Sequence, residues 1–204
     1  LLKYHGSKVV RGFFIEKDFD DFKAKRDPNE EVSIQEYIVG TRYYMHYFYS
    51  PITDGGYKLS KGSLEFLSID RRDESNVDGL YRMGTQDELG KMGIDPTFVV
   101  TGNSPMVLRE SLLPKAFAIG EQTVERSLEL FGGMIGPFSL ETIVTDDLEF
   151  KVFEISARIV AGTNLFVSGS PYADLMNENM STGRRIAREL RIAMEKNLLM
   201  EVLS

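Results

Sequence analysis

The sequence predicts an α+β protein in which antiparallel strands pack against a few helices. Five segments are rich in apolar residues, many of them β-branched or aromatic, and turn residues separate them. These predicted strands are residues 32–39, 43–49, 63–70, 138–144 and 148–155. Two other segments, beginning at Pro114 and Ser181, repeat apolar residues at three- and four-residue spacing, which is typical of helices.

The first 50 residues contain several short predicted elements. Two apolar strands flank a glycine-containing turn at residues 6–12. Residues 18–26 carry two phenylalanines three positions apart among charges, which favours a short amphipathic helix. The strands at 32–39 and 43–49 follow, and we expect Gly40-Thr41 to form the turn between them.

The middle of the chain alternates turns and strands. Asp54-Gly55-Gly56 predicts a turn before the strand at 63–70. Residues 71–96 are polar and interrupted by glycine, which predicts a long surface loop, and loops of that length are often functional. A strand is expected at 97–101.

The second half contains two longer helices and a hairpin. Proline favours the first helical turn, so Pro114 starts the first helix, and Gly132-Gly133 ends it. The strands at 138–144 and 148–155 form a hairpin about Asp146-Asp147. Ser181 caps the last helix, which runs toward the C-terminus with apolar residues on one face. Four arginines lie around the rest of that helix: Arg184, Arg185, Arg188 and Arg191.

Composition excludes several classes of protein. A chain of 204 residues with 42% hydrophobic content supports one large domain or two tightly packed subdomains. The formal net charge of −7 argues against nucleic-acid binding. The absence of cysteine excludes disulfides, a thiol nucleophile and thiolate zinc sites, and favours a cytoplasmic protein. No apolar run reaches the roughly 18 residues of a membrane span, and no signal peptide is apparent.

The strongest local signal is a pair of glutamates in the predicted hairpin. Glu141 and Glu154 each interrupt an apolar strand, and a buried carboxylate needs a counter-charge, which a metal ion would supply. A two-residue turn places Glu141 opposite Val152 and Glu154 diagonally adjacent on the same face. The alternative is that each glutamate faces solvent or pairs with Arg158 or Lys151, and the two readings stay open.

Three weaker signals accompany the glutamates. Residues 6–12 could wrap phosphates with backbone N–H groups beside Lys3, although an ordinary turn explains the same pattern. The segment 34–40 could offer backbone groups to an adenine ring, or be core alone. His5 and His46 are too few and too distant for a metal site, and we interpret them as hydrogen-bonded strand histidines.

Several of these strings together resemble a known enzyme family. The strings are YFYSPI (47–52), SIDRRDESNVDGL (68–80), VVTGNSPMVLRESLLP (99–114), MIGPFSLE (134–141) and FEISARIVAGTN (153–164). They resemble the archaeal formate-dependent AICAR ligase family, the 5-formaminoimidazole-4-carboxamide ribonucleotide synthetases of the ATP-grasp superfamily. The resemblance implies an ATP-grasp fold, with residues 1–50 in its small subdomain and 51–204 in its large subdomain.

The resemblance also implies a reaction and its residues. ATP phosphorylates formate, and the acyl phosphate formylates AICAR in purine biosynthesis. Arg158 is the candidate for stabilising the transferred phosphoryl group, and Asn103 for binding the AICAR ribonucleotide. Glu141 and Glu154 would hold Mg²⁺ or Mn²⁺, and Ser156 stands where many ATP-grasp enzymes have a ligating Asn. The residues implied for ATP are Lys3, Gly6, Gly12, Gln35, Glu36, Tyr37, Ile38 and Glu74.

The resemblance implies ATP, formate and AICAR as small-molecule partners and a homo-oligomer, while the net charge and the lack of a long apolar run predict no nucleic acid or membrane partner. The family has an N-terminal α/β domain that is not represented here, so we expect this chain to be an inactive fragment. Val9-Val10 departs from the family's glycine-rich phosphate loop and would stiffen it. Two alternatives therefore stay open: a paralogous ATP-grasp ligase for another acid and amine, and a nucleotide-binding protein without catalysis.

Overall fold

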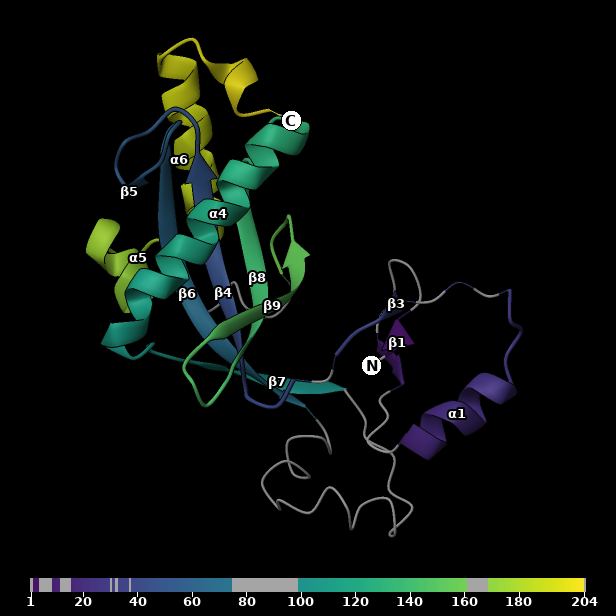
Figure 1. Ribbon diagram of the computed structural model, residues 1–204. Helices are drawn as coiled ribbons and strands as arrows, with labels where there is room; N and C mark the ends of the chain where they lie inside the picture. The colour runs from purple at the N-terminus through teal and green to yellow at the C-terminus, as the bar shows by residue number, and fades with distance from the viewer. Residues whose placement is uncertain are drawn as a thin grey trace. The chain divides into compact units, whose positions relative to one another are not determined.

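Figure 1 shows a computed structural model of the chain, which describes residues 2–3, 9–11, 16–29, 31, 33–36, 38–74, 99–160 and 169–203. The chain forms two compact units. The first comprises Leu1–Val39 and Asp73–Gly102, and the second comprises Gly40–Arg72 and Asn103–Ser204.

The first unit contains a small antiparallel sheet and one helix. The strand order is β2-β1-β3, with β1 at Leu2–Lys3, β2 at Val9–Arg11 and β3 at Ser33–Ile34. Helix α1, Glu16–Ala24, confirms the predicted amphipathic helix. Its exposed face carries an ion pair of 2.7 Å between Lys17 and Asp21, one turn apart.

Two predictions for the first 50 residues are wrong. Among the described residues of the expected strand at 32–39, only Ser33 and Ile34 form a strand, β3, which pairs with Leu2 and Lys3 of β1. The expected turn at Gly40-Thr41 is also wrong, since Thr41 is the first residue of β4, which pairs in a different sheet. A segment with high β-propensity forms a strand only where another strand is placed to pair with it.

The second unit is built on a larger antiparallel sheet with the order β5-β6-β4-β8-β9, and β7 also pairs with β6. The strands are β4 (Thr41–Ser50), β5 (Tyr57–Lys58), β6 (Ser63–Glu74), β7 (Val100–Pro105), β8 (Gly136–Val144) and β9 (Phe150–Ser156). The predicted strands at 43–49 and 63–70 and the predicted hairpin are confirmed. Residues 71–74 extend β6, so the predicted loop starts too early, and residues 75–98 lie outside the described part.

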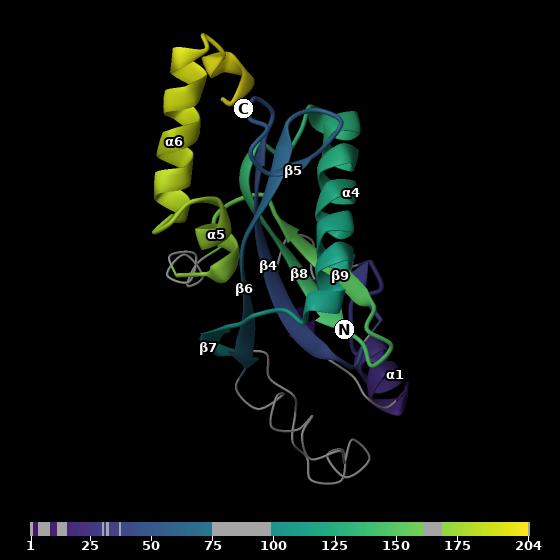
Figure 2. The ribbon, with the colours of Figure 1, turned by 90° about the vertical axis from the view of Figure 1, so that its left-hand side faces the viewer.

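Helices cover both faces of this sheet. They are α4 (Leu113–Phe131), α5 (Pro171–Met176) and α6 (Thr182–Glu195), with short 3₁₀ turns at Glu110–Leu112 and Leu199–Glu201. Seen nearly edge-on in Figure 2, α4 lies on one side of the sheet and α5 and α6 lie on the other. The expected α+β architecture of antiparallel strands with packed helices is therefore confirmed.

The predicted helix ends are confirmed with one adjustment. Pro114 lies in the first turn of α4, and Gly132 follows its last residue with a left-handed φ of 88°. Ser181 caps α6, where its hydroxyl accepts the Arg184 N–H at 3.2 Å. This helix ends at Glu195, earlier than its apolar spacing predicts. None of the described helices has both the length and the apolar character needed to cross a lipid bilayer.

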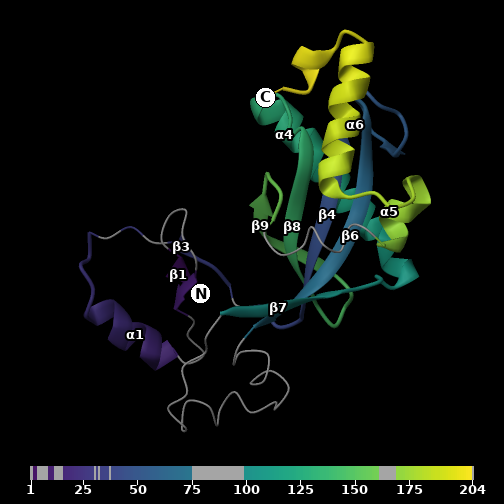
Figure 3. The same ribbon diagram turned by 180° about the vertical axis from the view of Figure 1, so that it is seen from behind.

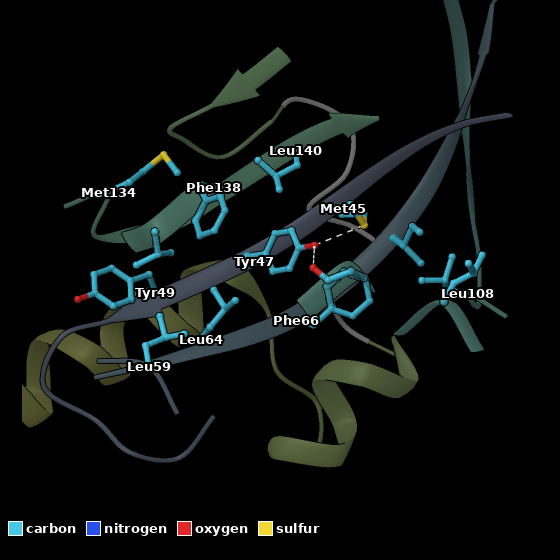
Figure 4. Packing of buried hydrophobic residues seen from close by; sticks show 14 of the residues in the cluster. Met45, Tyr47, Tyr49, Leu59, Leu64, Phe66, Leu108, Met134, Phe138 and Leu140 are labelled. Carbon is cyan, nitrogen blue, oxygen red and sulfur yellow. Dashed lines mark hydrogen bonds between the residues drawn. The ribbon is translucent and has the colours of Figure 1, made fainter. Parts of the chain in front are cut away.

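The main core lies between α4 and the sheet. Figure 4 shows many of its side chains on the strands. Alternate residues of β4, including Tyr47, point toward α4. The Tyr47 ring stacks on Phe138 with centroids 5.1 Å apart, and its hydroxyl donates to the Ala116 carbonyl at 2.9 Å. Gly120 allows α4 this close approach, because a Cβ there would lie 2.8 Å from side-chain atoms of Leu64 and Tyr47.

The opposite face packs on α5 and α6, as Figure 3 shows from behind. Beside a small apolar cluster, Arg185 is almost fully buried and is paired with two buried carboxylates. Its Nη2 lies 2.7 Å from Glu65 and its Nη1 lies 2.8 Å from Glu189, while its guanidinium lies over the Phe48 ring. The sequence placed this arginine among the four that lie around the rest of the helix, away from its apolar residues, and did not predict that it is buried.

Candidate functional site

Polar side chains line up across four strands on the face of the sheet opposite α4. Tyr44 of β4 is directly opposite Asp70 of β6 and Glu141 of β8, and Glu141 is opposite Glu154 of β9. We call these four residues the polar row. Directly opposed residues share one face of a sheet, so the row brings three carboxylates and a phenol to the same face of the sheet. Neighbouring strands are about 4.8 Å apart, and the row therefore spans roughly 14 Å.

The two glutamates lie closer in register than the sequence predicts. Glu141 pairs with Glu154 and not with Val152, because the strand register shifts between Glu141 and Thr142. The turn is also longer than two residues: Leu148 N–H donates to the Thr145 carbonyl at 2.9 Å, and β9 begins only at residue 150. The expected diagonal arrangement is therefore wrong, and the two glutamates are direct cross-strand neighbours.

This arrangement suits a divalent cation. Glu141 is buried and Glu154 is exposed. Like charges directly opposed across an antiparallel pair destabilise each other, so a shared cation would stabilise the pair. Magnesium is commonly held by one or two carboxylates together with substrate phosphates, and two carboxylates on one face match that set. No group of three or more His, Cys, Asp or Glu residues in the described part of the chain forms a complete protein-only metal site.

A buried hydrogen-bonded network adjoins the row at its Asp70 end. Asp70 is fully buried, and its Oδ1 is hydrogen-bonded to Nε2 of the buried His46. The Nδ2 group of Asn103, on β7, donates to Asp70 Oδ2 at 2.6 Å. The prediction of a hydrogen-bonded strand histidine is thus confirmed for His46, while His5 lies outside the described residues. Asn103, expected to bind substrate, is held by a carboxylate that the sequence analysis did not select.

Aromatic and hydroxyl groups complete this surface. The Arg72 guanidinium lies 4.0 Å from the centroid of the Tyr44 ring, which is a cation–π contact. Ser68 and Ser139 lie opposite His46 on its two sides. Both hydroxyls are buried and have no hydrogen-bond partner among the described residues. Buried hydroxyls are normally paired, so these two are exceptions on this face of the sheet.

The other predicted site residues lie in other segments of the chain. Gln35 and Ile38 are half-buried and Glu36 is exposed, all outside regular structure in the first unit. Glu74 is buried at the end of β6. Arg158 follows β9, and its Nη1 donates to the Ile159 carbonyl at 2.9 Å. Lys3 is in β1, and Gly6, Gly12 and Tyr37 lie outside the described residues.

The sequence analysis missed Tyr44, Asp70 and Arg72. Asp70 has a signal in the sequence, because it is one of two acidic residues, with Glu65, in the predicted strand at 63–70. A buried carboxylate in a strand needs a partner, as at Glu141. Tyr44 and Arg72 have no local signal, since their contact depends on the pairing of β4 with β6.

Two known proteins similar to this chain carry the same name. A protein named 5-formaminoimidazole-4-carboxamide-1-(beta)-D-ribofuranosyl 5'-monophosphate synthetase from Methanococcoides burtonii is 63% identical over 204 residues, which is 100% of this chain and 58% of that protein. A protein of the same name from Pyrococcus horikoshii is 51% identical over 214 aligned positions, which cover 100% of this chain and 62% of that protein.

A solved structure agrees with these relatives. The crystal structure of an IMP biosynthesis protein PurP from Thermococcus kodakaraensis matches with a TM-score of 0.61 and 33% sequence identity. The match covers 87% of this chain and 57% of that protein. The chain thus spans between half and two thirds of the length of these relatives.

The family model described as "Domain of unknown function (DUF1297)" matches residues 19–204, which is most of the chain. The relatives confirm the resemblance to the 5-formaminoimidazole-4-carboxamide ribonucleotide synthetases that the sequence motifs indicated. The chain belongs to the DUF1297 family.

Proposed function

We propose that the protein containing this chain is an ATP- and formate-dependent ligase that converts AICAR to FAICAR in purine (IMP) biosynthesis. The observation that carries this proposal is the match at 63% identity across the whole chain to a synthetase named for that product. Identity this high over the full length of the chain argues for a shared reaction more strongly than fold alone would. The ATP-grasp fold, the subdomain boundary at residue 50, a cytoplasmic location and a homo-oligomeric assembly belong to the same proposal.

The proposed reaction has two steps. A formate oxygen attacks the γ-phosphorus of ATP, which releases ADP and forms formyl phosphate. The amino nitrogen of AICAR then attacks the formyl carbon, expels phosphate and loses a proton. Phosphoryl transfer depends on alignment and charge neutralisation more than on a protein nucleophile, which is consistent with a chain that has no cysteine.

The polar row would supply groups that such chemistry needs. Glu141 and Glu154 would hold Mg²⁺ or Mn²⁺, and the bound ion would neutralise charge on the phosphates. Asn103 would contact AICAR at the other end of the surface, and Arg158 would bind the transferred phosphoryl group. Glu74 and Gln35 to Ile38 would contact the nucleotide, with Lys3, Gly6 and Gly12 around its phosphates.

The test is product analysis with the full-length protein, ATP, formate, AICAR and Mg²⁺. We expect formylated AICAR, ADP and phosphate in equal amounts. ATP-dependent ligation only of another acid or amine would instead identify a paralogous ligase. Nucleotide binding without turnover would identify a non-catalytic protein. This alternative is motivated by Val9-Val10, which stand where the family's phosphate loop is rich in glycine.

Substitutions in the hairpin test the metal role. Glu141→Gln and Glu154→Gln keep shape but remove charge, so each should lower kcat by about 100-fold or more. Each should also weaken Mn²⁺ binding measured by electron paramagnetic resonance in the presence of ATP. The control is Asp147→Asn, an exposed carboxylate in the same hairpin, which should change neither quantity. Equal kcat in all three variants would remove the metal site from the proposal.

A further inference from the structure

We infer that the buried carboxylate of Asp70 is a positioning residue that fixes which end of the Asn103 side-chain amide is offered to a ligand. Held in this way, Asn103 offers its carbonyl oxygen and acts as a hydrogen-bond acceptor. The group it recognises is therefore an N–H donor, such as the carboxamide of the substrate. This inference rests on the proposed function, in which Asn103 contacts AICAR.

The geometry of the network carries the first step. Asn103 Nδ2 lies 2.6 Å from Asp70 Oδ2, and His46 Nε2 is bonded to the other carboxylate oxygen. Asp70 has no exposed surface, and only 8% of the His46 side chain is exposed. Both carboxylate oxygens are thus engaged by groups from two other strands, β4 and β7, so the carboxylate has a single orientation.

The second step follows from donor and acceptor chemistry. An ionised carboxylate only accepts hydrogen bonds, while a side-chain amide has one donating end and one accepting end. A rotated Asn103 amide would place oxygen against oxygen in a site without water access to Asp70. The Nδ2 group must therefore face Asp70, which leaves the carbonyl oxygen as the end for another molecule.

The third step is the consequence for specificity. A site that presents an acceptor binds an amide N–H₂ and disfavours a carboxylate at the same position, because two acceptors then face each other. Sites built to hydrogen-bond a substrate N–H reject analogues that lack it by large factors. The network also adjoins the polar row, because Asp70 belongs to both and lies two strand spacings, about 10 Å, from Glu141.

The experiment compares two ligands that differ only in this group. Binding of AICAR and of its 4-carboxylate analogue to the full-length protein is measured by calorimetry with the natural residue and with Asp70→Asn. The natural protein should bind the amide at least about 100-fold more tightly. An Asn at position 70 can face Asn103 with either its oxygen or its nitrogen, so the Asn103 amide is no longer fixed. The preference should then fall to roughly tenfold or less.

The ratio of the two affinities distinguishes a positioning role of Asp70 from a general disruption of the site. Disruption would weaken the binding of both ligands by the same factor and leave the ratio unchanged. KM for ATP should be unchanged in Asp70→Asn, and the exposed control Asp54→Asn should keep the natural ratio. A crystal structure of the natural protein with AICAR gives a second measurement that needs no variant. It should show a ligand nitrogen within hydrogen-bond distance of Asn103 Oδ1.

Three results would overturn the inference. The first is an unchanged ratio in Asp70→Asn, the second is a natural preference for the carboxylate, and the third is an acceptor atom of AICAR against Asn103. In each of these the ligand still binds, so the proposed function survives. Absence of AICAR binding to the natural full-length protein would instead overturn the proposed function, and this inference with it.

Discussion

The side chain of Arg185 lies between Glu65 and Glu189 in the interior of the second unit. Replacing it with alanine would leave two buried carboxylates without their cation. We therefore expect Arg185→Ala to lower the free energy of unfolding by about 3–5 kcal/mol, measured by urea denaturation. The matched control from the same helix is Arg191→Ala, because 72% of the Arg191 side chain is exposed. It should change stability by less than about 0.5 kcal/mol, and equal effects of the two substitutions would contradict the burial of Arg185.

Buried tyrosines give stability a dependence on alkaline pH. Burial, with a smaller contribution from Glu125, raises the pKa of Tyr49 to about 12, and burial raises the pKa of Tyr47 far above its usual value. The unfolded chain ionises these phenols near pH 10, while the folded chain keeps them protonated. The stabilising contribution of Tyr49 is therefore complete below about pH 10 and is lost as pH rises toward its folded pKa.

Urea unfolding at about pH 9 and pH 11 measures this effect. We expect the natural protein to be less stable at the higher pH, and Tyr49→Phe to show a smaller loss, because its ring cannot ionise. Tyr49 also donates a hydrogen bond to the Lys61 carbonyl at 3.0 Å, so the variant should start from a lower stability at pH 9. An identical pH response in both proteins would show that Tyr49 ionises normally in the folded state.

At the scale of elements, two helical glycines predict opposite effects of the same substitution. An alanine Cβ at position 120 would lie 2.8 Å from side-chain atoms of Leu64 and Tyr47, whereas position 183 has nothing within 4 Å. Gly120→Ala should therefore destabilise the protein by about 1–3 kcal/mol through overpacking between α4 and the sheet. Gly183→Ala should stabilise it by up to about 1 kcal/mol, since alanine favours helix. Thermal unfolding of both variants measures the difference, and a stabilising Gly120→Ala would show that α4 does not approach β4 this closely.

Elements could be predicted where the information is local. Helix α4 has its proline start, its apolar spacing and its glycine end within one continuous segment, and the prediction was confirmed. The segment 32–39 has equally clear β-propensity, yet Ser33–Ile34 is the only strand among its described residues, because pairing depends on a partner elsewhere in the chain. The β8–β9 hairpin was predicted, but its register was not, since the irregularity at Glu141 and Thr142 changes which residues face each other.

At the scale of the whole molecule, the strands of the larger sheet differ in burial between the centre of the sheet and its β9 edge. Strand β4 has neighbours on both sides, and residues 44–50 are all buried. Strand β9 is the last in the sheet order, and Val152 and Ile155 are 40% and 52% exposed. Amide hydrogen exchange followed by mass spectrometry should therefore be slower for residues 44–49 than for 151–155. Faster exchange in β4 than in β9 would contradict the central position of β4.

The sequence by itself determined the α+β class, the main strands and helices, and the resemblance to the synthetases, because these depend on patterns within continuous segments. It also selected Glu141, Glu154 and Asn103. Only the tertiary structure decided that the two glutamates are directly opposed and that Asn103 is bonded to Asp70, 33 residues away. Strand register and contacts between distant residues result from the packing of the whole sheet, where neighbouring strands constrain one another, and no local segment contains that information.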